Sequence, residues 1–402
     1  MKRAAALGLL LMGCGSSAAE PGEEVRIGLL LPYTGKDGSA GANYERGVLM
    51  AVERVNAAGG LHKRPLRILY ADTHSDVDRG FQSAKSLVDQ GAVAIIGPED
   101  DELARELAPV LAAADVPLLT PSSSSVKSSA DALWFRLAPS SKDLGNALGR
   151  RIKTDGAQRI AVVSSSAVYE RSFASGASER LDSDGIAALT SQVISARSSN
   201  FSETIDAVSA TKPDAIVLAA DASTGSRFVN EYAFTASTRG IQWYLSPSLE
   251  HQAFVLNSLP DVVETMIGVA PDLKSGTQRE QFDSAFVERW NGVVPTTGAY
   301  FYYDALALYA LAYERAAQAS DSPTPPSDEV REQLLLASGQ SGLVVEWDEL
   351  AKGLKQASDG KGVYYSGVTG LIKLDQRTGT RATVSSRFWT IRDGQIGPVQ
   401  EQ

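Results

Sequence analysis

The chain has 402 residues, of which 43 % are hydrophobic and 21 % charged, so it can bury a core in two globular domains rather than remain disordered. A formal net charge of −10 argues against non-specific nucleic-acid binding. One cysteine and three histidines exclude an internal disulfide and a cysteine-rich metal site and disfavour a His-built one, so we expect neither a metal nor a cofactor.

The first residues predict an exported lipoprotein. A basic start, Met1-Lys2-Arg3, precedes an apolar run at 4–12 that is too short to span a bilayer. The run Leu11-Met12-Gly13-Cys14 resembles a bacterial lipobox, which implies a signal peptide at 1–13 and a lipid anchor on Cys14. The alternative is an ordinary secretory signal with an incidental cysteine. Residues 14–24 are small and polar and are expected to form a tether, which places the protein in the periplasm or cell envelope.

Strands and helices are expected to alternate over residues 25–120. β-branched and apolar runs predict buried strands, and apolar residues at helical spacing predict the helices between them. Pro109 lies inside the third helix and is expected to kink it or end it early. This order predicts a parallel sheet covered on both faces. The expected strands are 25–31, 65–71, 92–96 and 116–120, and the expected helices are 43–58, 76–90 and 102–114.

The same alternation restarts at residue 159, which predicts a second doubly wound lobe. The tail after residue 269 has too few strands for a third α/β domain, so we expect it to complete the two lobes. The proline-rich stretch 320–328 is expected to be a surface linker. The expected strands are 159–163, 187–193, 215–219, 241–245, 371–374 and 384–391, and the expected helices are 171–181, 202–210, 223–236, 277–290, 300–319, 328–337 and 347–357.

Short runs in a fixed order carry a family resemblance. Residues 27–35 read Ile-Gly-Leu-Leu-Leu-Pro-Tyr-Thr-Gly, and residues 55–60 read Val-Asn-Ala-Ala-Gly-Gly. With the runs that follow, the set resembles type I periplasmic binding proteins, most closely the leucine/isoleucine/valine-binding proteins of ABC transporters. The further runs are Ile95-Ile96-Gly97-Pro98, Val116-Pro117-Leu118-Leu119-Thr120-Pro121, Phe135-Arg136, Tyr302-Tyr303-Asp304-Ala305 and Tyr365-Ser366-Gly367-Val368-Thr369-Gly370.

The resemblance implies a two-lobed protein with a hinge of three crossing strands near 138–141, 269–272 and 369–375. The N-lobe would comprise 25–139 plus 271–368, and the C-lobe 140–270 plus 374–399. A ligand would bind between the lobes, and hinge closure would enclose it. The implied function is not enzymatic. The chain would bind a small polar solute, such as an amino acid, a branched-chain amino acid or an amide, and deliver it to an ABC permease.

Candidate ligand-binding residues follow the strands, because open α/β sheets bind ligands beyond the carboxyl ends of their strands. In the N-lobe these are Ser39 in the loop 33–41, Asp100, and the serines Ser122, Ser123 and Ser124. In amino-acid-binding relatives the loop after Pro121 holds the α-carboxylate, which implies this role for Ser122 and Ser124. The alternative is a flexible serine-rich turn.

In the C-lobe the candidates are Tyr169, Asp221 and Ser248, with Glu250 as a weaker one. The resemblance implies that Tyr169 lies over the ligand and that Asp221 lies where relatives bind the ligand ammonium. Two alternatives stay open: Tyr169 as a half-buried surface residue, and Asp221 as the N-cap of the helix that follows.

One feature departs from the family. Glu99-Asp100-Asp101 stands where amino-acid-binding relatives carry a serine pair, and three acids would repel a carboxylate. Either they cap the following helix, or the ligand is cationic or neutral rather than a standard zwitterion. The acidic turn also keeps a second function open: a non-transport envelope lipoprotein that uses the fold as a sensor or protein-interaction module. The Gly-x-Ser-x-Gly, phosphate-loop and His-Glu-x-x-His motifs do not occur in the sequence.

Overall fold

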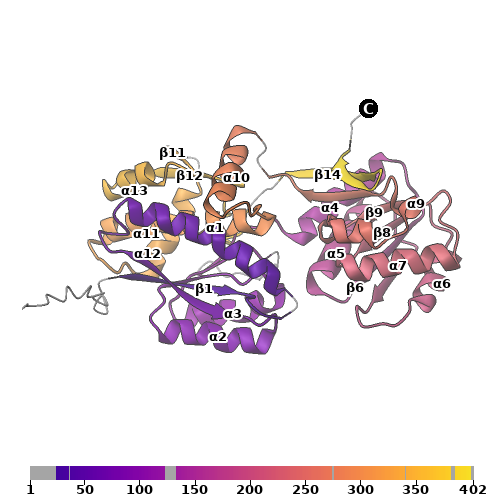
Figure 1. Ribbon diagram of the computed structural model, residues 1–402, viewed down its shortest axis with the longest axis horizontal. Coiled ribbons are helices and arrows are strands. Elements are labelled where there is room, and N and C mark those ends of the chain that lie inside the picture. The colour runs from indigo at the N-terminus through magenta and orange to yellow at the C-terminus, as the bar shows by residue number, and fades with distance from the viewer. Residues whose placement is uncertain are drawn as a thin grey trace, which may run out of the picture.

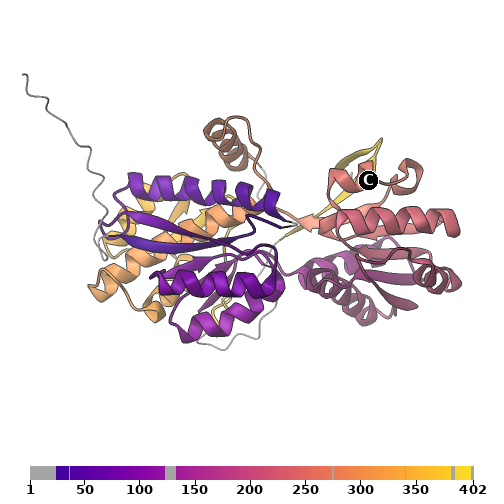
Figure 2. The ribbon, with the colours of Figure 1, turned by 60° about the horizontal axis from the view of Figure 1, so that its bottom comes forward.

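The computed structural model describes residues 24–35, 37–122, 133–273, 276–339, 341–381 and 385–399, and of Ser39 only the backbone. These residues form two α/β lobes that lie end to end along the longest axis of the molecule (Figure 1). A view turned by 60° shows that a narrow region joins the two lobes (Figure 2). Most helices run along the longest axis of the molecule in this view. The expected α/β class with two doubly wound parallel sheets is confirmed.

A five-stranded parallel sheet forms the centre of the first lobe. Its order is β2-β1-β3-β4-β5, so the direction of winding reverses between β1 and β3. The loops that follow these two strands therefore flank the crevice where open sheets bind ligands. The strands are β1 (Val25–Leu31), β2 (Leu66–Asp72), β3 (Ala94–Ile96), β4 (Leu118–Thr120) and β5 (Trp134–Arg136).

Different helices cover the two faces of this sheet, because side chains alternate along each strand. Ile27 and Leu29 pack in one core with residues of α1 (Gly38–Ala57) and α11 (Thr297–Ser320). Leu30 and Ile95 pack in another with residues of α2 (Val77–Asp89) and α3 (Asp101–Ala113). α3 continues through Pro109 to Ala113, so an early end of this helix is wrong. Buried Leu107, Ala108 and Leu111 hold it against the sheet on both sides of the proline.

A seven-stranded sheet forms the second lobe, in the order β15-β14-β10-β9-β8-β6-β7. The five strands from β7 to β10 are parallel, and here the winding reverses between β6 and β8. β14 and β15 extend the sheet in antiparallel fashion. The strands are β6 (Ile160–Ser165), β7 (Thr190–Ile194), β8 (Ala215–Ala219), β9 (Gln242–Leu245), β10 (Ile267–Pro271), β14 (Ser386–Arg392) and β15 (Gln395–Pro398).

The second sheet is also covered on both faces. α4 (Ser141–Thr154) and α5 (Val168–Ser183) pack on one face, so closely that a Cβ atom on Gly145 would clash with the carbonyl oxygen of Phe173. α6 (Ser202–Ala210) and α7 (Ala222–Thr235) cover the other face, as Figure 1 shows. Three short helices follow: η1 (Pro247–Leu249), α8 (Gln252–Leu256) and α9 (Pro260–Val263).

The tail completes both lobes, as expected. α11 is buried over most of its length in the first lobe, and β14 pairs with β10 in the second. The tail also contains a small sheet, β11-β12-β13, whose first two strands the sequence patterns did not predict. α13 begins at Leu350 rather than residue 347, because residues 347–349 form a turn after β11. The remaining elements are α10 (Thr277–Arg289), α12 (Ser327–Ala337), β11 (Leu343–Glu346), α13 (Leu350–Ser358), β12 (Val363–Gly367) and β13 (Gly370–Leu371).

A buried polar network lies where the chain leaves the first lobe for β14. Asp304 of α11 is fully buried and accepts hydrogen bonds from the Thr369 backbone N–H at 2.9 Å, the Thr369 hydroxyl at 2.6 Å and the Tyr365 hydroxyl at 2.8 Å. Arg381 donates to the carbonyl oxygens of Thr369 at 2.8 Å and Leu137 at 3.3 Å. These bonds tie α11 to the chain segments around Leu137 and Arg381.

Candidate functional site

Both lobes present polar loops where their strand order reverses. In the first lobe the loops after β1 and β3 contain Tyr33 and the acidic turn 99–101. In the second lobe the loops after β6 and β8 lead to Tyr169 and Asp221. α3 begins at the acidic turn and contacts α5, which begins beside Tyr169. The two carboxyl edges therefore face each other, which is the geometry of a site shared between lobes.

The acidic turn divides its three carboxylates among different roles. Asp100 is the N-cap of α3, and its Oδ1 accepts from the backbone N–H groups of Glu102 at 3.0 Å and Leu103 at 2.8 Å. Capping, one of the two alternatives for this turn, thus accounts for Asp100. Burial and then the charge and hydrogen bond of Glu99 raise the pKa of Tyr44, whose ring stacks on Tyr302 at 5.0 Å. Glu99 is therefore held on the first-lobe side.

Asp101 interacts electrostatically with the buried Arg136 of its own lobe and with residues of the second lobe. Its side chain is buried, in the first turn of α3. Burial lowers the pKa of Arg136 on β5, while the charges of Asp143 and Asp101 act in the opposite sense. The charge of Asp101 also raises the pKa values of Tyr169 and Glu170 in α5. Asp101 is thus electrostatically coupled to both lobes.

Ser122 is the one member of the serine run that the structure describes. It is buried, and its backbone N–H donates to the hydroxyl of Thr120 at 2.9 Å. That hydroxyl donates in turn to the carbonyl oxygen of Pro98, which joins the loops after β3 and β4. Ser123 and Ser124 lie outside the described residues, as do Cys14 and the side chain of Ser39.

Glu170 is the site residue that the sequence patterns missed. It is the third residue of α5 and is only 4 % exposed. Desolvation raises its pKa to about 7, the neighbouring hydroxyls of Ser248 and Ser246 act to lower it, and the charges of Asp221 and Asp101 raise it. Among the described residues, its Oε2 atom has no hydrogen-bond partner, and the Ser246 and Ser248 hydroxyls act on the carboxylate as hydrogen-bond donors. The sequence shows only that an acid directly follows Tyr169, and nothing in it indicates that this acid is buried.

The other second-lobe candidates lie around Glu170. Tyr169 precedes it and is partly exposed, and desolvation followed by the charge of Glu170 raises its pKa. Asp221 is the N-cap of α7 and accepts from the backbone N–H of Thr224 at 2.9 Å, which matches the capping alternative. Ser248 lies in η1, with its hydroxyl near the Glu170 carboxylate. Glu250 instead pairs with Arg387 at 2.8 Å.

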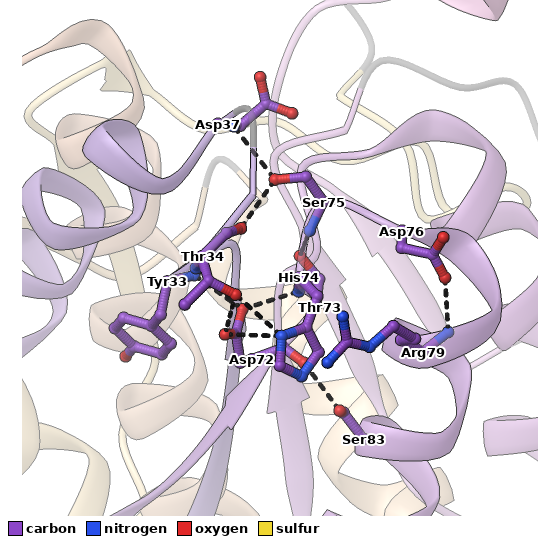
Figure 3. A network of polar contacts seen from close by, with 10 residues as sticks. All are labelled: Tyr33, Thr34, Asp37, Asp72, Thr73, His74, Ser75, Asp76, Arg79 and Ser83. Carbon is purple, nitrogen blue, oxygen red and sulfur yellow. Dashed lines mark hydrogen bonds and ion pairs between the residues drawn. The ribbon is translucent and has the colours of Figure 1, made fainter.

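A second polar network fixes the loops after β1 and β2 (Figure 3). The Asp72 carboxylate accepts from the backbone N–H groups of Tyr33 at 3.0 Å and His74 at 2.7 Å, and from the Thr34 hydroxyl at 2.6 Å. Burial acts to raise the pKa of Asp72, but these hydrogen bonds lower it overall. His74 lies 3.0 Å from the same carboxylate. The network ties the loop after β1 to the loop after β2 at the rim of the first lobe.

The cavity beside this rim is too small for an organic ligand. It measures about 20 Å³, the room of a single water molecule, and Asp37, Ser75, Glu99 and Asp100 are among its lining residues. Within the described ranges, no group of three His, Cys, Asp or Glu side chains is arranged to hold a metal ion. A search of the same residues finds no helix long and apolar enough to cross a membrane.

Comparisons with known proteins agree on one family. A family model described as periplasmic binding protein matches residues 24–336. The Leu/Ile/Val-binding protein BraC3 of Rhizobium johnstonii is 24 % identical over 196 residues, which cover 48 % of this chain and 53 % of BraC3. The chain thus matches about half the length of this curated relative.

Solved structures share the fold at low sequence identity. The branched-chain amino acid transporter substrate binding protein LivJ of Streptococcus pneumoniae, in complex with isoleucine, has a TM-score of 0.70 and 17 % identity, over 93 % of this chain and 97 % of LivJ. A solute binding protein of R. palustris, in complex with benzoate, has a TM-score of 0.71 and 15 % identity. The match covers 94 % of this chain and 95 % of the R. palustris protein. The same fold therefore accepts ligands of different charge.

Proposed function

This chain belongs to the periplasmic binding protein family, and from that premise we propose that it is the solute-binding component of an ABC transporter. It acts outside the cytoplasm, binds a small polar ligand between its lobes and passes it to a membrane permease. One observation carries the proposal: the carboxyl edges of both sheets meet, with α3 in contact with α5 and the buried Glu170 and Asp101 between them.

The proposed mechanism is hinge closure. The chain passes from β5 to α4, from β10 to α10 and from β13 to β14, which is three connections between lobes. We place the N-lobe at 25–139 plus 271–368, the C-lobe at 140–270 plus 374–399, and the hinge at the three crossings. A ligand that touches both lobes stabilises the closed state by its higher affinity for that state.

Membrane attachment is the second part of the proposal. Cys14 would carry the lipid after removal of residues 1–13, and residues 14–24 would tether the lobes to the membrane. Several acyl chains together bind a bilayer firmly, at about 0.8 kcal/mol for each buried methylene. Cys14→Ser tests this part: the variant should lose lipid labelling and be released from the membrane fraction, whereas unchanged membrane association would contradict the anchor.

Thermal unfolding with a ligand panel tests the binding function. The full chain, purified in detergent, is heated with lysine, norleucine, leucine, 1,4-diaminobutane, glutamate or benzoate. A ligand at 100 times its dissociation constant adds about 2.7 kcal/mol to the free energy of unfolding, so a true ligand raises the melting temperature by several degrees. If members of one chemical class raise it, the proposal is supported. No rise with any class contradicts solute binding and favours the sensor or interaction-module alternative.

A further inference from the structure

The desolvation cost of burying Glu170 is only partly offset by its own lobe, through the Ser246 and Ser248 hydroxyls. It is 4 % exposed, and its Oε2 atom has no hydrogen-bond partner among the described residues. An acid in the first turn of a helix is stabilised there by the helix dipole, but an exposed side chain would gain the same benefit with little desolvation. The helix dipole therefore does not explain why Glu170 is buried. A positively charged partner that binds from outside the chain would explain it.

Among the described residues, the two charged groups that act on Glu170 most strongly are both negative. Asp221, from the N-cap of α7, and Asp101, from α3 of the first lobe, both act on it as negative neighbours. Ser246, the N-cap of η1, and Ser248 within it contribute uncharged hydroxyls that hydrogen-bond the carboxylate. The positive charge of Arg136 interacts with Asp101, and it is not among the charges that most strongly shift the pKa of Glu170. Counting only described residues, once Arg136 balances Asp101, Glu170 and Asp221 leave a net negative charge at the junction of the lobes where α3 meets α5, which we call the gap.

This gap coincides with the reversal point of the second sheet. Glu170 follows β6 and Asp221 follows β8, and these are the two strands between which the winding reverses. Ligands of open α/β sheets bind outside the carboxyl ends at that point. Ser246 follows the next strand, β9, is fully buried, and places its hydroxyl beside the Glu170 carboxylate. A buried carboxylate with one unpartnered oxygen thus lies where a ligand is expected.

We infer that Glu170 pairs with a protonated amine of the ligand, and that the gap selects a small molecule of net positive charge over a neutral zwitterion. The inference rests on the proposed solute-binding function and specifies its ligand class. The Ser246 hydroxyl supplies a further acceptor for an N–H group of the same amine. Because the amine needs the charged carboxylate, binding strengthens as Glu170 loses its proton.

Matched ligands and matched variants test the inference by calorimetric titration of the full chain. Lysine and norleucine differ only in the terminal amine, and 1,4-diaminobutane carries amines without a carboxylate. Glu170→Gln keeps the shape of the side chain and removes its charge. Glu179→Gln is the control, because it removes a charge from an exposed residue of the same helix, paired with Lys142 at 2.8 Å. Circular dichroism establishes that both variants are folded.

The wild type should bind lysine or 1,4-diaminobutane more tightly than norleucine. Glu170→Gln should weaken binding of the cationic ligand by about 30-fold or more, while Glu179→Gln should leave its dissociation constant unchanged. In the wild type, affinity should fall from pH 7.5 to pH 5.5, a range in which an aliphatic amine stays protonated, and this dependence should vanish in Glu170→Gln.

The other outcomes separate the inference from the proposed function. Tighter binding of norleucine or leucine than of any cation would overturn the inference and leave solute binding intact. Cation binding that Glu170→Gln leaves unchanged, or that shows no pH dependence, would overturn the role of Glu170 alone. No binding by any member of the panel would overturn both.

Discussion

Removing the charge of Glu170 should stabilise the ligand-free protein above neutral pH. The pKa of this carboxyl is about 7 in the folded protein against an ordinary value of 4.5. At about 1.4 kcal/mol for each pH unit of difference, the charged form costs the fold about 3 kcal/mol relative to the protonated form. Glu170→Gln keeps a neutral side chain of the same shape at every pH and so avoids this cost.

The sign of the pH dependence follows from which state holds the proton more tightly. Because the folded-state pKa is raised, the folded protein binds the proton more tightly than the unfolded chain does. The contribution of Glu170 is therefore most favourable below pH 4.5, declines as the pH rises from 4.5 to 7, and is level above that. The free energy of unfolding of Glu170→Gln, relative to wild type, should rise by about 3 kcal/mol over the same interval.

Urea unfolding at several pH values from 4.5 to 8, followed by circular dichroism, measures this difference. Glu179→Gln is again the control, and its difference from wild type should stay nearly constant over the range, because hydrogen bonding to Lys142 lowers the pKa of Glu179. Parallel curves for wild type and Glu170→Gln would refute the reasoning, since they would show that Glu170 titrates normally and is not desolvated.

Three further variants test the structural parts of the site. Asp304→Asn should destabilise the fold by about 3 kcal/mol in urea unfolding, because the amide NH2 that replaces one carboxylate oxygen cannot accept the hydrogen bonds donated to it, from Thr369 at Oδ2 or from Tyr365 at Oδ1; a cost within error of zero would refute this role. Asp100→Ala should cost about 1 kcal/mol through loss of the α3 N-cap, and Asp100→Ser should restore most of it; failure of the serine to rescue would argue against capping. Asp72→Asn should destabilise by about 1–2 kcal/mol at pH 7. Because the folded-state pKa of Asp72 is lowered, the gap from wild type should narrow as the pH falls below about 3.8, and a gap independent of pH would contradict the hydrogen-bonded carboxylate.

Strong local patterns made much of the fold predictable. The apolar run of β1 and the helical spacing in α2 recur in the structure within a residue or two of the expected bounds. α4 was not predicted: Leu144, Leu148 and Ile152 recur at helical spacing, but Gly145 and Gly149 lie among them and have low helix propensity. β11 and β12 are short and pair only with each other and β13, so no long alternating pattern marks them.

The candidate site was predictable to the level of loops but not of individual roles. Asp100 and Asp221 each had a capping and a ligand-binding interpretation, and only hydrogen-bond geometry shows that both cap helices. Glu170 was missed because its importance depends on burial, which arises when α5, α7, η1 and α3 come together. No local pattern around residue 170 contains that information.

Enclosure of a ligand by movement of the two lobes is the central claim, and a distance measured across the gap tests it most directly. Spin labels at R105C in α3 and S175C in α5, both exposed positions on helices that contact each other, report this distance by pulsed electron resonance. Saturation with the ligand that gives the largest thermal shift should make the distance distribution shorter and narrower. An unchanged distribution at saturation would contradict closure of the lobes on a ligand.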